Sequence, residues 1–169
     1  MITKGIQRTL WAWRAVPIIL LMAAGAGLIA CKSKPPKPPP PPPPVILTLS
    51  LTASADVNPD SQNRPSPVVV RLYQLKDDAA FKDADIYALF DKEQATLGAG
   101  LASREEYELA PSEHRALTIK PPPDVRFIGV VAAYRDIRNA QWRAQLGVPD
   151  KSKTIVINVA HTSVSMSMY

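Results

Sequence analysis

The sequence predicts an all-β domain, a two-sheet antiparallel β-sandwich of seven to eight strands with a short helical insertion between strands 2 and 3. Three observations support this fold class. Short apolar or alternating runs follow one another from residue 45 to residue 169. Turn-forming Pro, Asn and Asp residues separate these runs. Helix-like spacing replaces the alternation in one stretch only, residues 77–97.

Residues 1–30 have the pattern of a secretory signal peptide. Three basic residues precede a short apolar run, and the run ends in small residues. This run, residues 16–30, is shorter than the about 20 residues that span a bilayer. We therefore predict that the segment is removed and takes no part in the fold.

The only cysteine, Cys31, directly follows Ala30. A cysteine in this position makes the segment resemble a bacterial lipoprotein signal. The resemblance implies cleavage before Cys31, a diacylglycerol on its sulfur and an N-acyl chain on the new amino group. Because several acyl chains anchor far more firmly than one, the mature chain is expected at a membrane surface. No other cofactor and no disulfide are expected.

Residues 31–44 form the lipidated cysteine and a proline-rich tether. Nine of the ten residues from Pro35 to Pro44 are proline. Proline fixes φ and lacks an amide donor, so we expect a polyproline II rod about 30 Å long. The rod is interpreted as a spacer, and the alternative is a ligand for an aromatic groove.

Residues 45–169 form the β-sandwich domain. Leucine and alanine alternate with serine and threonine over residues 47–55, which predicts a half-buried first strand. Residues 56–67 contain three prolines and many turn formers, so they form a loop. The loop is longer than a usual hairpin connection and either binds a partner or only crosses between the sheets. The second strand is expected over 68–75.

A helical stretch comes next, with Asp77 or Asp78 and then Asp85 as N-caps and an end at Gly98. The most apolar of the later runs, residues 126–134, is expected in the centre of a sheet. The remaining strands are expected at 105–109, 115–120, 140–148, 154–160 and 163–168.

The sequence offers little for catalysis. His114 and His161 have no ligand-spaced partner, so no metal site is expected. Glu105 and Glu106 are adjacent, and on a strand they would point to opposite faces. Six of the 20 basic residues precede residue 45, which leaves the domain near neutral against 15 acidic residues. We therefore expect no enzyme, no small-molecule substrate and no binding of nucleic acid.

A periplasmic glycan-binding or peptidoglycan-binding lipoprotein is the alternative function. It requires exposed aromatic side chains beside Asp or Arg on one face. Four aromatic residues of the domain occupy strand patterns, where aromatics are more often part of the core; these are Tyr73, Phe127, Tyr134 and Trp142.

The domain resembles the TssJ lipoproteins of the type VI secretion system. The resemblance covers most of residues 47–160 in order, in the segments 53–60, 64–75, 81–89, 91–97, 104–106 and 130–135. It implies a β-sandwich with a helical segment, lipid-anchored in the outer membrane and facing the periplasm. It also implies binding to the periplasmic C-terminal domain of TssM, an inner-membrane protein, so that the secretion complex is tied to the outer membrane. Lys32 agrees with this location, because an aspartate there is associated with inner-membrane retention.

The resemblance places the partner contact in the loop between the first two strands. The implied contact residues are Asn58, Pro59, Asp60, Ser61, Gln62, Asn63, Arg64, Pro65 and Ser66. Asn63 stands where a turn glycine is usual in the family, and the proline run is longer than usual.

Overall fold

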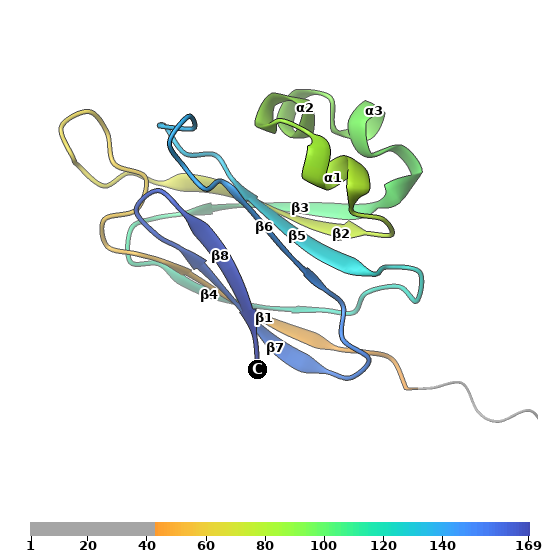
Figure 1. Cartoon of the computed structure of the whole chain (residues 1–169). Helices are drawn as coiled ribbons and strands as arrows, with labels where there is room; N and C mark the ends of the chain where they lie inside the picture. The colour runs from red at the N-terminus through yellow and green to blue at the C-terminus, as the bar shows by residue number, and fades with distance from the viewer. Residues whose placement is uncertain (1–42) are drawn as a thin grey trace, which may run out of the picture. The chain divides into compact units, whose positions relative to one another are not determined.

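The computed structural model describes residues 43–169, which fold as two packed four-stranded sheets (Figure 1). The signal peptide, Cys31 and most of the tether lie outside the described residues. The first sheet has the order β4-β1-β7-β8, with β4 His114–Ile119, β1 Leu47–Ala53, β7 Lys153–Val159 and β8 Val164–Met168. The second has the order β3-β2-β5-β6, with β3 Leu101–Leu109, β2 Val68–Leu75, β5 Phe127–Ala132 and β6 Arg143–Gly147.

The predicted sandwich is confirmed, and it has eight strands. One strand pair differs from the predicted antiparallel arrangement. Strands β1 and β7 run parallel, whereas every other strand pair is antiparallel. An alternating pattern shows which face of a strand is buried and carries no information on strand direction. The apolar run at 126–134 does form an inner strand, β5, between β2 and β6.

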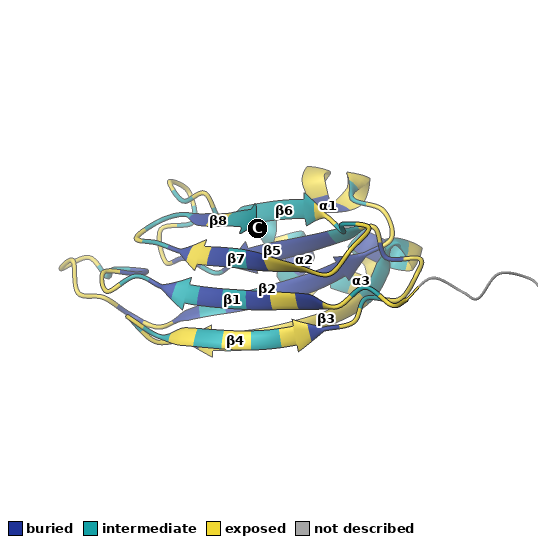
Figure 2. Cartoon of the chain, turned by 90° about the horizontal axis from the view of Figure 1, so that it is seen from below, coloured by how far each residue is buried: buried dark blue, intermediate teal, exposed yellow. Residues whose placement is uncertain are grey.

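The main hydrophobic cluster lies between the two sheets (Figure 2). A second cluster joins the second sheet to the helical residues that follow β2; its members are Tyr73, Leu75, Phe81, Leu89, Leu97 and Val131. The alternating leucines of β1 point inward with 0% exposure, at Leu47, Leu49 and Leu51. Ile155 and Ile157 of β7 are also fully buried. Burying each such side chain contributes about 1.5–3 kcal/mol, so strict alternation determines which face of this sheet meets the other.

The helical insertion lies between β2 and β3, as predicted, and covers the outer face of the second sheet (Figure 1). It consists of α1 Ala79–Asp83, α2 Ile86–Asp91, α3 Glu93–Leu97 and a 3-10 turn at Gly98–Gly100. Asp85 caps α2 as predicted, because its carboxylate accepts a hydrogen bond from the Ala88 amide. At α1 the side chain of Asp77, rather than that of the N-cap residue Asp78, accepts from the Ala79 amide.

Two arginines fasten the insertion to the sheet. The Arg71 guanidinium on β2 donates to the carbonyl oxygens of Leu89 and Phe90, each at 3.1 Å. Arg143 on β6 donates to the carbonyl oxygen of Ala84 at 2.9 Å and also to that of Phe81. Carbonyl groups at the C-terminal end of a helix lack hydrogen-bond donors within the helix. The two arginine side chains supply these donors.

Gly129 on β5 makes room for the helical insertion, so a larger residue at this position should destabilise the domain. A Cβ at this position would lie 2.7 Å from Cζ of Phe81, whose ring is fully buried. Gly129→Ala is expected to lower the free energy of unfolding by about 1–3 kcal/mol through overpacking. Urea titration measures this loss. Gly147→Ala on β6 is the matched control, because its Cβ meets only a backbone oxygen at 3.9 Å. Equal stability of both variants would contradict the prediction.

Candidate functional site

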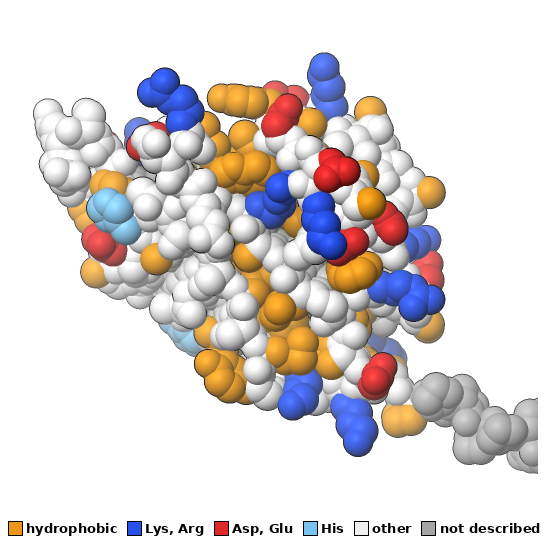
Figure 3. Space-filling model, viewed as in Figure 1, with side chains coloured by type: hydrophobic (Ala, Val, Ile, Leu, Met, Phe, Trp, Pro, Cys, Tyr) orange, Lys and Arg blue, Asp and Glu red, His pale blue; other side chains and the backbone are white. Residues whose placement is uncertain are grey.

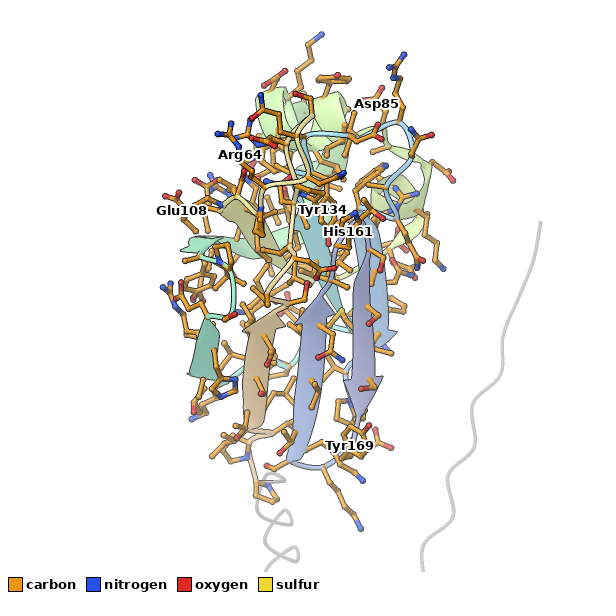
Figure 4. All side chains as sticks on the ribbon, turned by 90° about the vertical axis from the view of Figure 1, so that its left-hand side faces the viewer. Arg64, Asp85, Glu108, Tyr134, His161 and Tyr169 are labelled. Atoms are coloured by element: carbon orange, nitrogen blue, oxygen red, sulfur yellow. The ribbon has the colours of Figure 1, made fainter. Side chains whose placement is uncertain are left out.

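Three connections meet at one end of the sandwich, and the described chain begins at the opposite end (Figure 1). They are the β1–β2 loop (54–67), the β5–β6 connection (133–142) and the β7–β8 turn (160–163). A hollow of about 500 Å³ lies between them. Its lining includes Asn58, Asp60, Tyr134, Arg135, His161 and Thr162. Figure 4 shows Arg64, Tyr134 and His161 at this end and Tyr169 at the other.

The β1–β2 loop crosses from one sheet to the other, because β1 and β2 belong to different sheets. Its middle projects beyond the end of the sandwich (Figure 1). Residues 61–65 are all exposed, whereas Val57 and Asn58 are buried. The loop thus has two parts, a buried base and an exposed tip.

Two of the implied contact residues belong to the base. Asn58 is 4% exposed and Ser66 is 8% exposed. The Ser66 amide donates to the carbonyl oxygen of Val57 at 3.1 Å, which closes the base. These two residues therefore belong to the buried base, and the other seven implied contact residues lie between them in the sequence.

Asp60 organises the exposed tip (defined here as residues 60–65). Its carboxylate accepts hydrogen bonds from the amides of Gln62 and Arg64, at 2.8 and 3.0 Å. The Arg64 side chain donates to the same carboxylate through Nε at 2.8 Å. Asn63 has φ of 57° and thus takes the left-handed conformation in which glycine is usual. The tip is therefore an ordered turn, held from within by one carboxylate.

This geometry predicts how the tip responds to acid. The hydrogen bonds from Arg64 lower the pKa of Asp60 from 3.8 to about 2. A lowered pKa means that the ordering is fully present above the ordinary value and is lost as the pH falls through about 2. The amide resonances of Gln62 and Arg64 are expected to titrate with a midpoint near this lowered pKa. A midpoint near 3.8 would show that the carboxylate is free of these partners.

The exposed tip carries one pair of opposite charges, Asp60 and Arg64, and its other residues are uncharged. Figure 3 shows the projecting loop as white, the colour of polar and backbone atoms, whereas charges of both signs mix over the helical insertion. The Arg64 side chain is 71% exposed although it pairs with Asp60. Rigid polar groups flanked by Pro59 and Pro65 lose little entropy when they bind.

Sequence reasoning missed the other two connections of this end. Arg135 and Asp136 are exposed in the β5–β6 connection, and Thr162 lies in the β7–β8 turn. Tyr134 is 5% exposed, its hydroxyl donates to the Ala160 carbonyl oxygen at 3.2 Å, and burial raises its pKa. An alternating pattern gives no information on which turns lie close together in space. These two connections could therefore be identified only from the order of the strands in the sheets.

His161 lies in the β7–β8 turn beside the loop base, and Glu105 and Glu106 lie on β3. His161 lies 3.2 Å from the carboxylate of Asp56, where it supports the base of the loop. Among residues 43–169, no group of three His, Cys, Asp or Glu side chains is placed to hold a metal ion. Glu105 and Glu106 do point to opposite faces, since Glu106 pairs with Arg71 while Glu105 accepts from the Tyr107 hydroxyl.

Of the four aromatic residues predicted on strands, none is exposed in the described structure. Tyr73 and Tyr134 are core residues, as predicted, and Phe127 and Trp142 are half-buried. The exposed aromatic residues of this region are Tyr87 in the helical insertion and Tyr169 at the end away from the loop. No helix in this part of the chain is long and apolar enough to cross a bilayer.

Comparison with known families gives a match over residues 46–162. The matching family is described as "Type VI secretion lipoprotein, VasD, EvfM, TssJ, VC_A0113". This is a family of secretion lipoproteins rather than of enzymes. No curated protein sequence matches the chain.

Solved structures agree with the family match. The T6SS lipoprotein TssJ1 from Pseudomonas aeruginosa is 35% identical, with a TM-score of 0.73, and the match covers 75% of this chain and 98% of TssJ1. Serratia marcescens Lip, a membrane-bound component of the type VI secretion system, is 25% identical, with a TM-score of 0.67 and coverage of 72% and 96%. A chain in the structure of the T6SS protein TssM C-terminal domain from EAEC is 28% identical, with a TM-score of 0.60 and coverage of 72% and 97%.

Proposed function

Because this chain belongs to the family of type VI secretion lipoproteins that includes TssJ, we propose that it anchors the secretion membrane complex by binding the periplasmic C-terminal domain of TssM. In this function the protein is a lipid-anchored adaptor of the outer membrane that faces the periplasm. Its contribution is to hold an inner-membrane protein at high effective concentration near the outer membrane.

The observation that carries this proposal is the placement of the two attachment points. The described chain begins at one end of the sandwich, where the tether joins β1, and the β1–β2 loop projects from the other end (Figure 1). A domain attached to the membrane through its first residues presents such a loop away from that membrane. The match to a chain in the TssM C-terminal domain structure supports TssM as the partner.

The contact surface proposed here is the exposed tip together with Pro59. It comprises Pro59, Asp60, Ser61, Gln62, Asn63, Arg64 and Pro65. The Arg64 guanidinium is the strongest candidate for a dominant contact, because arginine is enriched among residues that carry most of the binding energy. Its charge is already directed by Asp60, so binding requires little reordering.

The anchor in this proposal is the lipid on Cys31, a diacylglycerol and an N-acyl chain. The proline run between Cys31 and β1 acts as the spacer, with a length of about 30 Å. The domain itself performs no catalysis and needs no metal ion or small-molecule cofactor. The protein acts by being attached at both ends at once, to the outer membrane through the lipid and tether and to TssM through the loop.

A binding measurement tests the proposal directly. Full-length protein, purified from membranes in detergent, is titrated with the TssM periplasmic C-terminal domain by calorimetry. We expect a saturable complex of defined stoichiometry, and purified peptidoglycan sacculi under the same conditions should retain none of the protein. Retention by sacculi without binding to the TssM domain would overturn the proposal in favour of a glycan-binding lipoprotein.

A further inference from the structure

We propose that Asn58 is a positioning residue that joins the three connections of the loop end into one rigid docking surface. This inference rests on the proposed function and specifies how the partner-binding loop is held. Asn58 itself is 4% exposed, so the role proposed for it does not require direct contact with the partner. Its role is exerted through the backbones that it links.

One side chain joins two separate segments to the loop base. The Asn58 amide nitrogen donates to the carbonyl oxygen of Pro67 at 2.7 Å, which ties the start of the loop to its end. Its Oδ1 accepts from the amide of Arg135 at 2.8 Å, which ties the loop to the β5–β6 connection. These bonds span 9 and 77 residues of sequence.

The backbone of the same residue makes a third link. The Asn58 amide donates to the carbonyl oxygen of His161 at 3.0 Å, in the β7–β8 turn. All three connections that surround the hollow are therefore bonded to Asn58. Because the polar groups of the buried Asn58 are costly to leave without partners, the three connections hold one arrangement rather than several.

The position admits few other residues. Its φ is 48°, a conformation that Gly, Asn and Asp tolerate and that other side chains rarely adopt. Glycine offers no side chain to bond with Pro67 or Arg135. Aspartate supplies the acceptor for the Arg135 amide and lacks the donor for Pro67. Asparagine alone of these residues meets the conformational requirement and both hydrogen bonds.

This arrangement has a consequence for affinity. When only part of a population has the binding-competent arrangement, the apparent dissociation constant rises in proportion. A loop end that samples several arrangements therefore binds more weakly even if every contacting side chain is unchanged. The effect of a substitution at Asn58 on affinity should therefore follow how well ordered the three connections are. It should not depend on contacts between Asn58 and the partner.

A graded series of variants tests the inference in the full-length protein. Asn58→Gly keeps the backbone conformation and removes both side-chain bonds, and Asn58→Asp keeps only the acceptor for Arg135. We expect the exchange rate of the Arg135 amide to rise at least tenfold in Asn58→Gly and less in Asn58→Asp. The dissociation constant for the TssM periplasmic C-terminal domain should follow the same order, with a loss of at least tenfold in Asn58→Gly.

Two controls separate positioning from other effects. Asn63→Gly makes the same substitution at a similar φ, in the exposed tip, and should leave exchange of the Arg135 amide unchanged. Arg143→Ala loosens the helical insertion on the outer face of the second sheet and should leave affinity within twofold, which removes general loss of stability as an explanation.

The outcomes are distinct. If Asn58→Gly raises exchange of the Arg135 amide and still binds within threefold of the unmodified protein, Asn58 has no positioning role. The same conclusion follows if Arg143→Ala weakens binding as much as Asn58→Gly does. If changes in the exposed tip also leave binding intact, it is the loop contact of the proposed function that fails.

Discussion

Replacing Cys31 with serine is expected to release the protein from the membrane and to abolish type VI secretion. The only cysteine of the sequence, and with it the predicted site of the lipid, is lost. A serine hydroxyl does not become a thioether, so neither the diacylglycerol nor the later N-acyl chain is added. Membrane fractionation and an assay of secreted protein measure the two effects.

The fold should survive this substitution, since the hydrophobic clusters of the described residues are built from residues 45–169. The melting temperature of the soluble variant is expected to equal that of the native protein in detergent. A Cys31→Ser strain that still secretes at the native level would show that the lipid is not the anchor.

Replacing the exposed tip, residues 60–65, with glycine and serine of equal length is expected to weaken TssM binding at least tenfold. The substitution removes Arg64 and the turn held by Asp60, and a few such residues carry most of the binding energy of an interface. The melting temperature should change little, because the tip lies outside both hydrophobic clusters. Calorimetric titration and thermal unfolding of the same sample give both quantities.

The limits of the substituted segment matter for this result. A replacement that extends over 58–66 would also remove Asn58 and Ser66, which are buried in the loop base. It would then lower stability and binding together and would not separate the two. Glycine–serine replacement of residues 121–123, at the opposite end, is the matched control and should leave affinity unchanged. Equal losses of stability and affinity in the tip variant would make the tip structural.

The alternation of leucines in β1 predicted the buried face of the first sheet because a one-residue shift would expose all of them. After Leu75 the apolar residues change from alternation to helix-like spacing, and this change located the helical insertion. The alternation could not predict the direction of a strand or which strands lie next to it in the sheet. The parallel pairing of β1 with β7 depends on packing between residues about 100 positions apart, and no local pattern reports it.

The loop was predictable from the sequence, whereas its role as the partner contact stays a prediction. The resemblance to the TssJ family located the loop, and its prolines and turn formers marked it as a connection. What the sequence could not separate was the exposed tip from the buried base. Asn58 and Asn63 are both asparagines at positive φ, yet one bonds three segments and the other lies at the surface. Only contacts distant in sequence distinguish them.

Cross-linking in living cells tests the central claim, that the loop end binds TssM while the other end is anchored. A photoreactive amino acid is placed at Gln62 in the exposed tip, and at Tyr87, which is 67% exposed on the helical insertion, as a control. The account predicts a covalent adduct with TssM from position 62 and none from position 87. An adduct from position 87 without one from position 62, in cells that secrete normally, would contradict it.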